Sequence, residues 1–295
     1  MNTHELCCIG HITHDKIVTP KRTAHMPGGT SFYFSHAIKQ FDDIDYALIT
    51  ALGEEDMHVV DEMRRLGLQV EVMPSRQSVY FENIYGENQD NRTQRVLAKA
   101  DPFTVDIEAH IFHLGSLLAD DFSLEVVKYL SGKGKLSIDS QGYLREVRGT
   151  DVFAVDWQQK HEFLKYATFL KANEQEMYSL TGYNDVEKAA KELHSWGVKE
   201  VLLTLGSNGS VIYDGEQFHL IPAYKPTEIV DATGCGDTYM TGYLYCRAKN
   251  KSIDEAGRFA AAISTLKIEA MGPFAGTRAD IKRCMQEAEQ TFPSL

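Results

Sequence analysis

Short apolar runs alternate with stretches of helical periodicity along most of the chain, which predicts strands alternating with helices. The run Val201–Leu205 is apolar at nearly every position, which is typical of a strand buried on both faces. The order of these elements indicates βαβ units and a mainly parallel sheet in an α/β fold. The expected strands are Leu6–Ile9, Tyr46–Thr50, Ile111–Leu114, Leu136–Ser140, Thr168–Ala172, Val201–Leu205 and Ser210–Tyr213. The expected helices are Ser31–Gln40, Asp56–Leu66, Phe122–Leu130, Val186–Trp196, Thr238–Lys249, Ile253–Ala270 and Ala279–Glu289.

One segment departs from this alternation. Two strand-like runs, Ser78–Tyr85 and Arg92–Leu97, flank the turn-forming cluster Gly86–Asn91. This pattern predicts an antiparallel hairpin. Open α/β sheets bind ligands in a crevice at the carboxyl ends of their strands, so we expect the hairpin to form a lid over that crevice. The alternative is a plain hairpin at the edge of the sheet.

Composition narrows the class of protein. The 295 residues include 30 Lys and Arg against 42 Asp and Glu, for a formal net charge of −12, which disfavours nucleic acid or an anionic membrane as the main partner. No apolar run reaches the ~18 residues that span a bilayer, and Met1–Leu6 lacks the pattern of a signal peptide. Five scattered cysteines are typical of reduced thiols. We therefore expect a cytoplasmic protein, and the length allows one large domain or two smaller ones.

The segment Asp231–Asp237 carries the most specific pattern. It reads Asp-Ala-Thr-Gly-Cys-Gly-Asp, and a helical pattern follows at once. Gly234 and Gly236 permit a tight turn, and such a turn at a helix N-terminus directs N–H groups toward an anion. Asp237 either stabilises the helix N-terminus or accepts a proton from a hydroxyl that attacks a bound phosphate.

This segment resembles the C-terminal signature of the PfkB (ribokinase-like) carbohydrate kinases. The resemblance implies that Asp237 is the catalytic base and that the backbone N–H groups of Gly234, Cys235 and Gly236 form an anion hole. Residues that differ from the commonest ones at their positions are Ala232, Cys235 and Thr241. Cys235 contributes only its backbone N–H in this arrangement, so its side chain should be tolerated.

The same resemblance implies a fold. It is a single ribokinase-like domain over residues 1–295, a three-layer α/β/α sandwich with a mainly parallel central sheet and a small β lid. In this chain the lid is expected from about residues 14–27 and 76–99.

A second segment, Asn173-Glu-Gln-Glu176, is similar to the family's Asn-x-x-Glu motif. The resemblance implies that Asn173 contacts ATP and that Glu176 organises Mg²⁺, partly through water, around the phosphates. Carboxylate and amide oxygens suit that ion. The alternative is a surface helix that begins here, with Asn173 as its cap.

The loop after Val201–Leu205 resembles the family's Thr-x-Gly-x-x-Gly loop, which lines the nucleotide. The alternative is a turn into the strand Ser210–Tyr213. The loop residues expected to line ATP are Thr204, Gly206, Ser207 and Gly209.

Many relatives also use a monovalent cation beside the Asp that begins the signature, so the resemblance suggests K⁺ at Asp231.

The N-terminal half supplies the expected acceptor site. Asp15 resembles the aspartate that binds sugar hydroxyls, although a loop aspartate is the alternative. Gly28 and Gly29 resemble the family's Gly-Gly substrate motif. Tyr33 stands where the family often has an Asn, which leaves the identity of the sugar open. The other expected acceptor residues, after the strand Leu136–Ser140, are Gln141 and Arg145.

These patterns together imply an ATP-dependent kinase that requires Mg²⁺ and phosphorylates a hydroxyl of a sugar or polyol. One alternative is a nucleoside kinase, in which Tyr33 or a neighbouring aromatic residue stacks on the base. Another is a sugar-binding regulator without catalysis. The family also suggests a homodimer formed through the lid. Basic residues near the lid that would suit a phosphorylated acceptor, or else lie in solvent, are Lys21, Arg22, Arg92 and Arg95.

Overall fold

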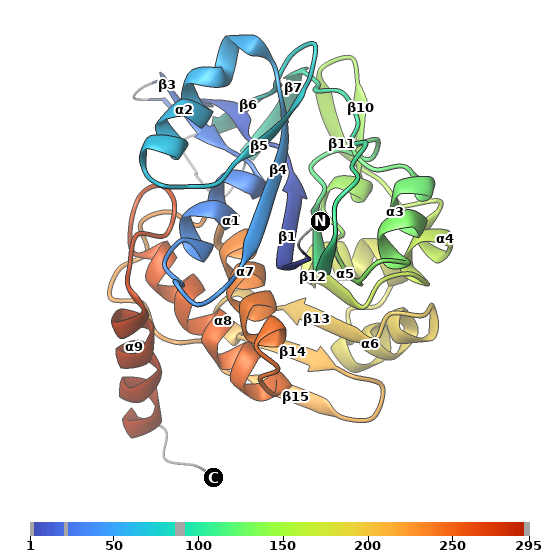
Figure 1. Ribbon diagram of the computed structural model, residues 1–295. Helices are drawn as coiled ribbons and strands as arrows, with labels where there is room; N and C mark the ends of the chain where they lie inside the picture. Colours follow the sequence, from blue (N-terminus) through green and yellow to red (C-terminus); the bar gives the residue numbers. More distant parts are fainter. Residues whose placement is uncertain (1–2, 21–22, 86–91, 292–295) are drawn as a thin grey trace.

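The computed structural model describes residues 3–20, 23–85 and 92–291. Within them a central sheet has the strand order β15-β14-β13-β12-β9-β8-β1-β4-β5 (Figure 1). Neighbouring strands from β13 to β5 are parallel, and β14 and β15 extend the sheet in antiparallel fashion, so the expected mainly parallel sheet is confirmed. The strands are β1 (His4–Gly10), β4 (Tyr46–Leu52), β5 (Glu71–Pro74), β8 (Ala109–Gly115), β9 (Lys135–Asp139), β12 (Phe169–Asn173), β13 (Glu200–Thr204), β14 (Ser210–Tyr213) and β15 (Phe218–Ile221).

Helices cover both faces of this sheet (Figure 1). Strand β1 shows why, because Leu6 and Cys8 belong to one buried cluster while Cys7 and Ile9 belong to another. The first cluster includes side chains of α1 (Thr30–Ile38), α2 (Met57–Arg65), α7 (Cys235–Ala248), α8 (Ile253–Ile268) and α9 (Arg278–Thr291). The second includes α3 (Leu124–Ser131), α4 (Lys160–Leu164), α5 (Glu174–Thr181) and α6 (Val186–Ser195). Short 3₁₀ turns are η1 (Glu54–Asp56), η2 (Gly142–Leu144) and η3 (Gly206–Asn208).

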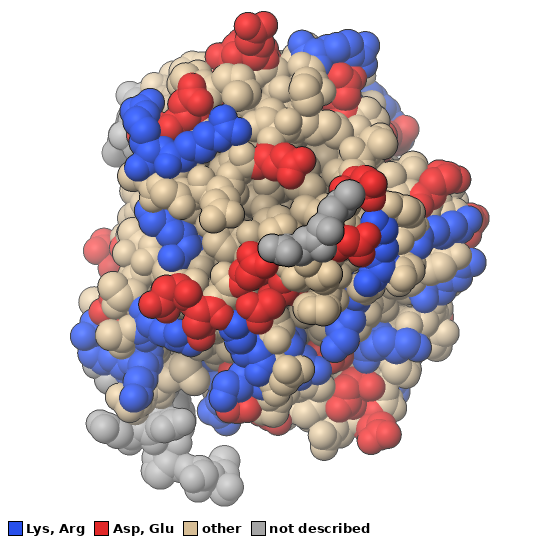
Figure 2. All heavy atoms as spheres, viewed as in Figure 1, with Lys and Arg blue, Asp and Glu red and all other residues tan. Residues whose placement is uncertain are grey.

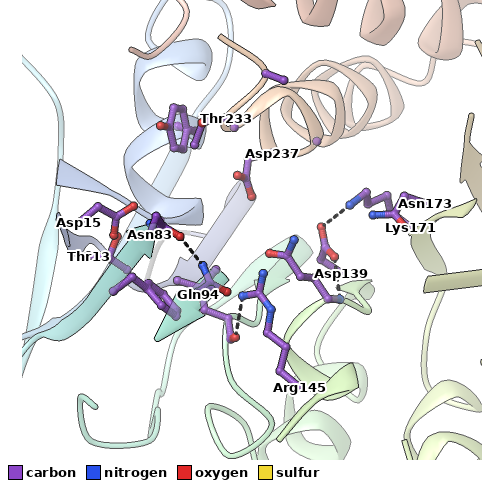
Figure 3. A pocket seen from close by; sticks show the side chains of 18 of the residues that line it. Thr13, Asp15, Asn83, Gln94, Asp139, Arg145, Lys171, Asn173, Thr233 and Asp237 are labelled. Atoms are coloured by element: carbon purple, nitrogen blue, oxygen red, sulfur yellow. Dashed lines mark hydrogen bonds and ion pairs between the residues drawn. The ribbon is translucent and has the colours of Figure 1, made fainter. Parts of the chain in front are cut away.

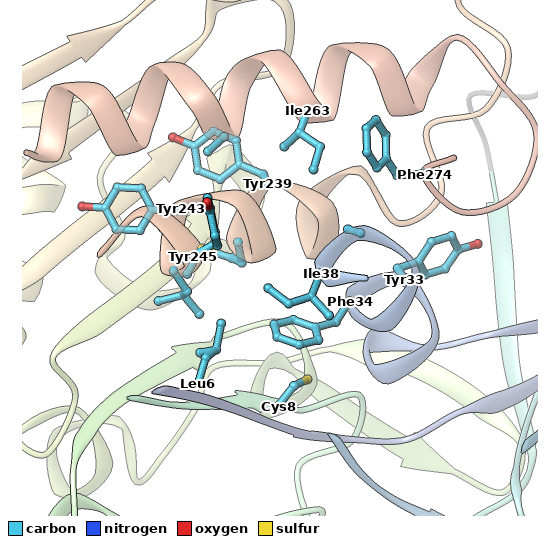
Figure 4. Packing of buried hydrophobic residues seen from close by; sticks show 14 of the residues in the cluster. Leu6, Cys8, Tyr33, Phe34, Ile38, Tyr239, Tyr243, Tyr245, Ile263 and Phe274 are labelled. Carbon is cyan, nitrogen blue, oxygen red and sulfur yellow. The ribbon is translucent and has the colours of Figure 1, made fainter. Parts of the chain in front are cut away.

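The layer between β1 and the helices α1, α7 and α8 is filled with aromatic and aliphatic side chains (Figure 4). Phe34 and Ile38 of α1 and Tyr239 and Tyr243 of α7 belong to this cluster, and all four are buried. Close packing of this kind holds α7 in one position relative to the sheet. The N-terminus of α7 is therefore a rigid platform.

A second, six-stranded sheet lies beside the first, with the order β10-β11-β7-β6-β2-β3. The predicted hairpin is present as the antiparallel pair β6 and β7, and the expected turn Gly86–Asn91 lies outside the described residues. The strands β10 and β11 were not expected and widen this sheet. Its strands are β2 (Thr13–Val18), β3 (Thr23–Gly28), β6 (Val79–Tyr85), β7 (Arg92–Ala98), β10 (Arg145–Arg148) and β11 (Asp151–Ala154).

One helix begins earlier than the sequence pattern predicts. Helix α7 starts at Cys235 rather than Thr238, because Gly234 takes a left-handed conformation (φ 75°) and caps the helix. The segment Gly-Cys-Gly-Asp is therefore the cap and first turn of α7 and not a loop before it.

The surface in view in Figure 2 carries interspersed acidic and basic side chains. Ion pairs between charged side chains include Lys133 with Asp106 (2.8 Å) and Arg76 with Asp101 (2.6 Å). Among the helices in the described ranges, each is too short or too polar to cross a lipid bilayer.

Candidate active site

A cavity of about 350 Å³ lies where the carboxyl ends of the central strands meet the second sheet and the start of α7 (Figure 3). Residues from both halves of the chain line it, which is where ligands bind in open α/β sheets. Expected site residues in its lining are Asp15, Gly29, Tyr33, Gln141, Arg145, Asn173, Thr204, Gly234, Gly236 and Asp237. Lining residues that the sequence analysis did not single out are Thr13, Ile17, Phe81, Asn83, Gln94, Leu117, Asp139, Lys171, Ala232 and Thr233.

The start of α7 approaches its neighbours so closely that Gly234 has no room for a side chain and Gly236 has little. A Cβ atom on Gly234 would lie 2.2 Å from the Tyr33 ring, and one on Gly236 would lie 3.2 Å from Lys171 Nζ. Backbone N–H groups in the first turn of a helix have no partner within the helix, and the helix dipole favours negative charge there. The N–H of Cys235 donates to the Ala232 carbonyl (3.2 Å), and its thiol lies outside the cavity lining.

The Asp237 carboxylate points into the cavity from the first turn of α7 (Figure 3). It is otherwise enclosed by protein, and this burial raises its pKa to about 6. Repulsion from Asp139 acts in the same direction, while a hydrogen bond with Thr30 and attraction to Lys171 and Arg145 oppose it. A carboxylate with such a pKa is mostly ionised at neutral pH and can still accept a proton.

A buried ion pair lies next to Asp237. Lys171 Nζ is 3.1 Å from Asp139 Oδ2 and 3.6 Å from Glu176 Oε2. Burial alone would lower the pKa of Lys171, but the Asp139, Glu176 and Asp237 carboxylates outweigh it and hold that pKa above its usual value. The ammonium therefore stays charged beside the N–H groups of α7. An ammonium beside the N–H groups of a helix N-terminus is an arrangement that can bind an anion.

Asn173 and Glu176 make a reciprocal cap at the start of α5. Asn173 Oδ1 accepts from the Glu176 N–H (2.9 Å), and Glu176 Oε2 accepts from the Asn173 N–H (2.8 Å). The helix cap that was the alternative reading of Asn173 is thus present, yet Asn173 also lines the cavity. Glu176 lies behind it, outside the lining. Burial, with Asp139, raises the pKa of Glu176, against the attraction of Lys171.

The glycine loop after β13 lies at the rim. Thr204 lines the cavity, whereas Gly206, Ser207 and Gly209 lie outside its lining. They form η3 and a tight turn into β14, with Leu205 N–H donating to Gly209 O (2.8 Å). A turn at this place was the alternative reading of the loop.

The acceptor side begins at Asp15 on β2. Its carboxylate accepts a hydrogen bond from the Thr13 hydroxyl (2.7 Å). The chain from β3 to α1 passes so close that a Cβ on Gly28 would lie 2.6 Å from Asp15 Oδ2, and one on Gly29 would lie 2.3 Å from His11 O. Gly28 thus supports the Asp15 carboxylate from outside the cavity lining, and Gly29 lines the cavity itself.

The second sheet closes the cavity on the opposite side from α7. Gln94 Nε2 donates to Asn83 Oδ1 (2.9 Å), which links the facing amides of β6 and β7 (Figure 3). Phe81 lies two residues before Asn83 on the same face of β6. Arg145 donates to Leu117 O (3.1 Å), and its guanidinium lies 5.9 Å from the centre of the Phe81 ring. Phe81 and Asn83 lie two positions apart on one face of β6, so the period-two alternation of a strand is the sequence signal that could have identified them together.

Of the basic residues proposed for a phosphorylated acceptor, the structure describes the side chain of Arg95, and it lies outside the cavity lining. Arg95 pairs with Glu82 (3.5 Å) and Asp151 (3.1 Å) outside the lining. Lys21 and Arg22 lie outside the described residues, as does the side chain of Arg92.

Asp231, at the start of the signature, lies beneath the loop and outside the cavity lining. Lys267 Nζ donates to the Asp231 carbonyl (2.7 Å) and to Asp231 Oδ2 (3.1 Å). Burial would raise the pKa of Asp231, but hydrogen bonds from Thr233 and the charge of Lys267 lower it overall.

Known proteins resemble this chain over most of its length. The model of the pfkB family carbohydrate kinases matches residues 4–279. Cytidine kinase from Thermococcus kodakarensis is 26% identical over 269 residues, which cover 86% of this chain and 92% of that protein. A pyrophosphate-dependent myo-inositol-1 kinase, converted into a myo-inositol-3 kinase by replacing an Asn and a Ser with Leu, has a similar structure (TM-score 0.82, 26% identity, 97% of this chain and 100% of that chain). Arabidopsis thaliana ribokinase complexed with ribose and ATP shares the fold (TM-score 0.77, 20% identity, 97% and 99% covered).

Proposed function

The chain belongs to the PfkB family of carbohydrate kinases, and from that starting point we propose that it transfers the γ-phosphoryl group of ATP to a hydroxyl of a sugar or sugar-like polyol. One observation carries this proposal. Asp237, with a pKa of about 6, points into a cavity whose other side is lined by Asp15 and by the amides of Asn83 and Gln94. A base and a polar acceptor site thus face each other across one space.

In this reaction Asp15 and its neighbours hold the acceptor so that one hydroxyl reaches Asp237. The hydroxyl oxygen forms a bond to the γ-phosphorus as the bond from that phosphorus to the bridging oxygen of ADP breaks. Asp237 takes the proton of the hydroxyl, and ADP leaves with the electron pair of the broken bond. Positioning and electrostatic stabilisation provide most of the rate in such transfers.

The charge on the transferring group is stabilised by Lys171 and the start of α7. The N–H groups of Gly234, Cys235 and Gly236 are proposed to hold its oxygens, as the signature implies. Lys171 adds a charged donor that the sequence analysis did not identify. Donors fixed in advance and shielded from water favour the transition state because they need no reorganisation during the reaction.

Mg²⁺ fits the oxygen donors at the other end of the cavity. Asp139 and Asn173 line it there, and Glu176 bonds to Asn173 through Oε1 (2.9 Å). Carboxylate and amide oxygens are what this ion takes, and it keeps several waters. When bound with the nucleotide it neutralises charge on the phosphate oxygens. These three residues would hold it through its bound waters, because their own oxygens already accept hydrogen bonds within the protein. Thr204 and the loop Gly206–Gly209 are proposed to line the nucleotide.

The acceptor side favours a small molecule with many hydroxyls. Asp15, Asn83 and Gln94 each place a carboxylate or amide on the cavity lining, and such groups suit the hydroxyls of an acceptor. In the myo-inositol kinase with a similar structure, the two substituted residues lie eleven positions apart, as Asn83 and Gln94 do. This agreement supports a role for the pair in selecting which hydroxyl is phosphorylated.

A nucleoside acceptor is the second candidate. Phe81, Ile17 and Tyr33 form an apolar part of the lining, which would suit the face of a base. The similarity to a cytidine kinase points in the same direction.

A panel of acceptors and donors tests the proposal. ADP release from Mg-ATP is measured with pentoses, hexoses, hexose phosphates, inositols and nucleosides, and phosphate release from pyrophosphate is measured with the same panel. Phosphorylation of one polyol or sugar with ATP supports the proposal. A nucleoside as the sole acceptor supports the second candidate. Turnover with pyrophosphate and not with ATP would mean that pyrophosphate is the phosphoryl donor. Binding of an acceptor without turnover would favour a sugar-binding regulator without catalysis.

A further inference from the structure

Lys267 is a buried cation that the reaction described above does not use. It lies on α8 with 1% of its surface exposed. Its ammonium donates to the Asp231 carbonyl (2.7 Å) and carboxylate (3.1 Å). A buried ammonium is tolerated only when paired and hydrogen-bonded, so these contacts explain its position.

Asp231 is also where the family resemblance suggests K⁺, but its oxygens are already engaged. Oδ1 accepts from the Thr233 N–H (2.9 Å), and Oδ2 accepts from the Gly272 N–H (3.3 Å) as well as from Lys267. The carbonyl oxygen also accepts from Lys267. A cation bound there would have to displace these donors and lie against a like charge. The residues present therefore do not fit K⁺ at Asp231.

The Lys267 ammonium contacts the start of the loop Asp231–Gly236, whose N–H groups are proposed to bind phosphate. Asp231 connects through Thr233 to Gly234, whose backbone packs against the ring of Tyr33. Lys267 Nζ is 5.9 Å from the centre of that ring. A fixed positive charge in this position favours negative charge on the loop's other side and holds the Asp231 end of the loop in one conformation.

We propose that Lys267 is a built-in substitute for a monovalent cation, so that this kinase turns over without K⁺. The proposal rests on the kinase function above. Lys267 is a positioning residue that acts through Asp231 and the loop, and it does not contact either substrate. The structural relationship is specific, because the one side chain occupies both the carbonyl and the carboxylate oxygen of Asp231.

The first test is the response of the wild-type enzyme to cations at constant ionic strength. Rates with K⁺, Na⁺ or tetramethylammonium chloride should agree within about twofold. A twofold change in rate corresponds to a change in activation free energy that is smaller than the thermal energy RT. Strong and selective activation of the wild type by K⁺ would overturn the proposal. If no acceptor is phosphorylated under any condition, the proposed function fails, and the stability measurement below still tests Lys267.

The second test removes the ammonium. In Lys267→Ala the space left beside Asp231 should admit a small cation, so K⁺, ammonium or methylammonium should restore kcat lost by the variant while tetramethylammonium should not. The melting temperature of the variant should rise selectively with the same cations, with or without turnover. Lys133→Met, which removes a surface ammonium paired with Asp106 and Glu108, is the matched control and should show neither response.

Two results would contradict the role. One is a folded Lys267→Ala enzyme that keeps full rate without added cations. The other is a loss of rate and stability that no cation changes, which would make Lys267 a structural residue only. If Lys267→Ala does not fold, Lys267→Met retains most of the side-chain volume, and the proposal then requires a slow enzyme whose melting temperature responds to small cations.

Discussion

Lys171 Nζ lies 3.1 Å from Asp139 Oδ2, and this pair sets opposing forces on the neighbouring Asp237. The Asp139 carboxylate raises the pKa of Asp237, and the Lys171 ammonium lowers it. Burial adds to the first effect, and the balance leaves the pKa of Asp237 at about 6. The Asp237 carboxylate is thus mostly ionised at neutral pH, as its proposed role of proton acceptor requires.

Replacing Asp237 by Asn should remove the proton acceptor without changing the shape of the cavity. We expect kcat to fall by about 10²–10⁴-fold, the usual contribution of a general base, while both substrates still bind. Steady-state kinetics and calorimetric binding check this. Asp120→Asn, at an exposed site paired with Lys99, should retain full kcat. An Asp237→Asn enzyme with normal kcat would rule out the assigned role.

The pH profile should report the pKa of Asp237. Below about 6 the carboxyl group is protonated and cannot accept a proton, so kcat/KM should fall tenfold per pH unit on the acid side and level off above. In Asp139→Asn the repulsion is removed, which lowers the pKa of Asp237 and moves the acid limb to lower pH. An acid limb that stays in place would show that another group controls it.

Lys171→Met should affect both rate and stability. Loss of the cation removes a stabilising contact to the transferring phosphoryl group, and we expect kcat to fall by about 10²–10³-fold. It also leaves Asp139 and Glu176 buried without their partner, which should destabilise the fold by about 3–5 kcal/mol. Denaturant unfolding measures the second effect. The acid limb of the pH profile should move to higher pH, opposite to the shift in Asp139→Asn.

Asn83→Leu should change the choice of acceptor and not the use of the donor. The apolar side chain would leave the Gln94 amide without its partner, and an unpaired polar group costs about 1–3 kcal/mol, so the KM for the preferred acceptor should rise about tenfold or more. The KM for ATP should stay constant. Glu82→Gln, on the opposite face of the same strand, is the control. An equal effect of both variants on the acceptor would exclude a direct role for Asn83.

The sequence patterns predicted the strands and helices better than the positions of the buried polar residues. Alternation of strands and helices identified the parallel sheet, and the turn signals around Gly86–Asn91 identified the hairpin of β6 and β7. The glycine signature located Asp237. The strands β10 and β11 went unnoticed because each has four residues and partners distant in sequence.

Buried charges were missed for a different reason. Lys171 is a single charged residue in an apolar strand and Asp139 is the last residue of another, and periodicity alone does not show that two residues from separate strands meet. Lys267 lies in an amphipathic helix, where a lysine is usually on the solvent face. Its burial depends on Asp231, 36 positions away. Interactions between distant elements decide these cases, and local pattern carries no information about them.

The parallel pairing of β2 with β6 has a consequence for how the protein acquires its activity. Thr13 pairs with Val79, so 66 positions separate the two strands when β2 and β6 meet, and β10 and β11 join from still later in the chain. The central sheet contains a wider separation, because His4 of β1 pairs with Ala109 of β8, and α7 begins only at Cys235. Such distant pairings are slow because the connecting chain loses entropy first. Both walls of the cavity therefore depend on contacts distant in sequence, and a refolding chain should acquire its activity only after α7 has packed, as the last step and not gradually.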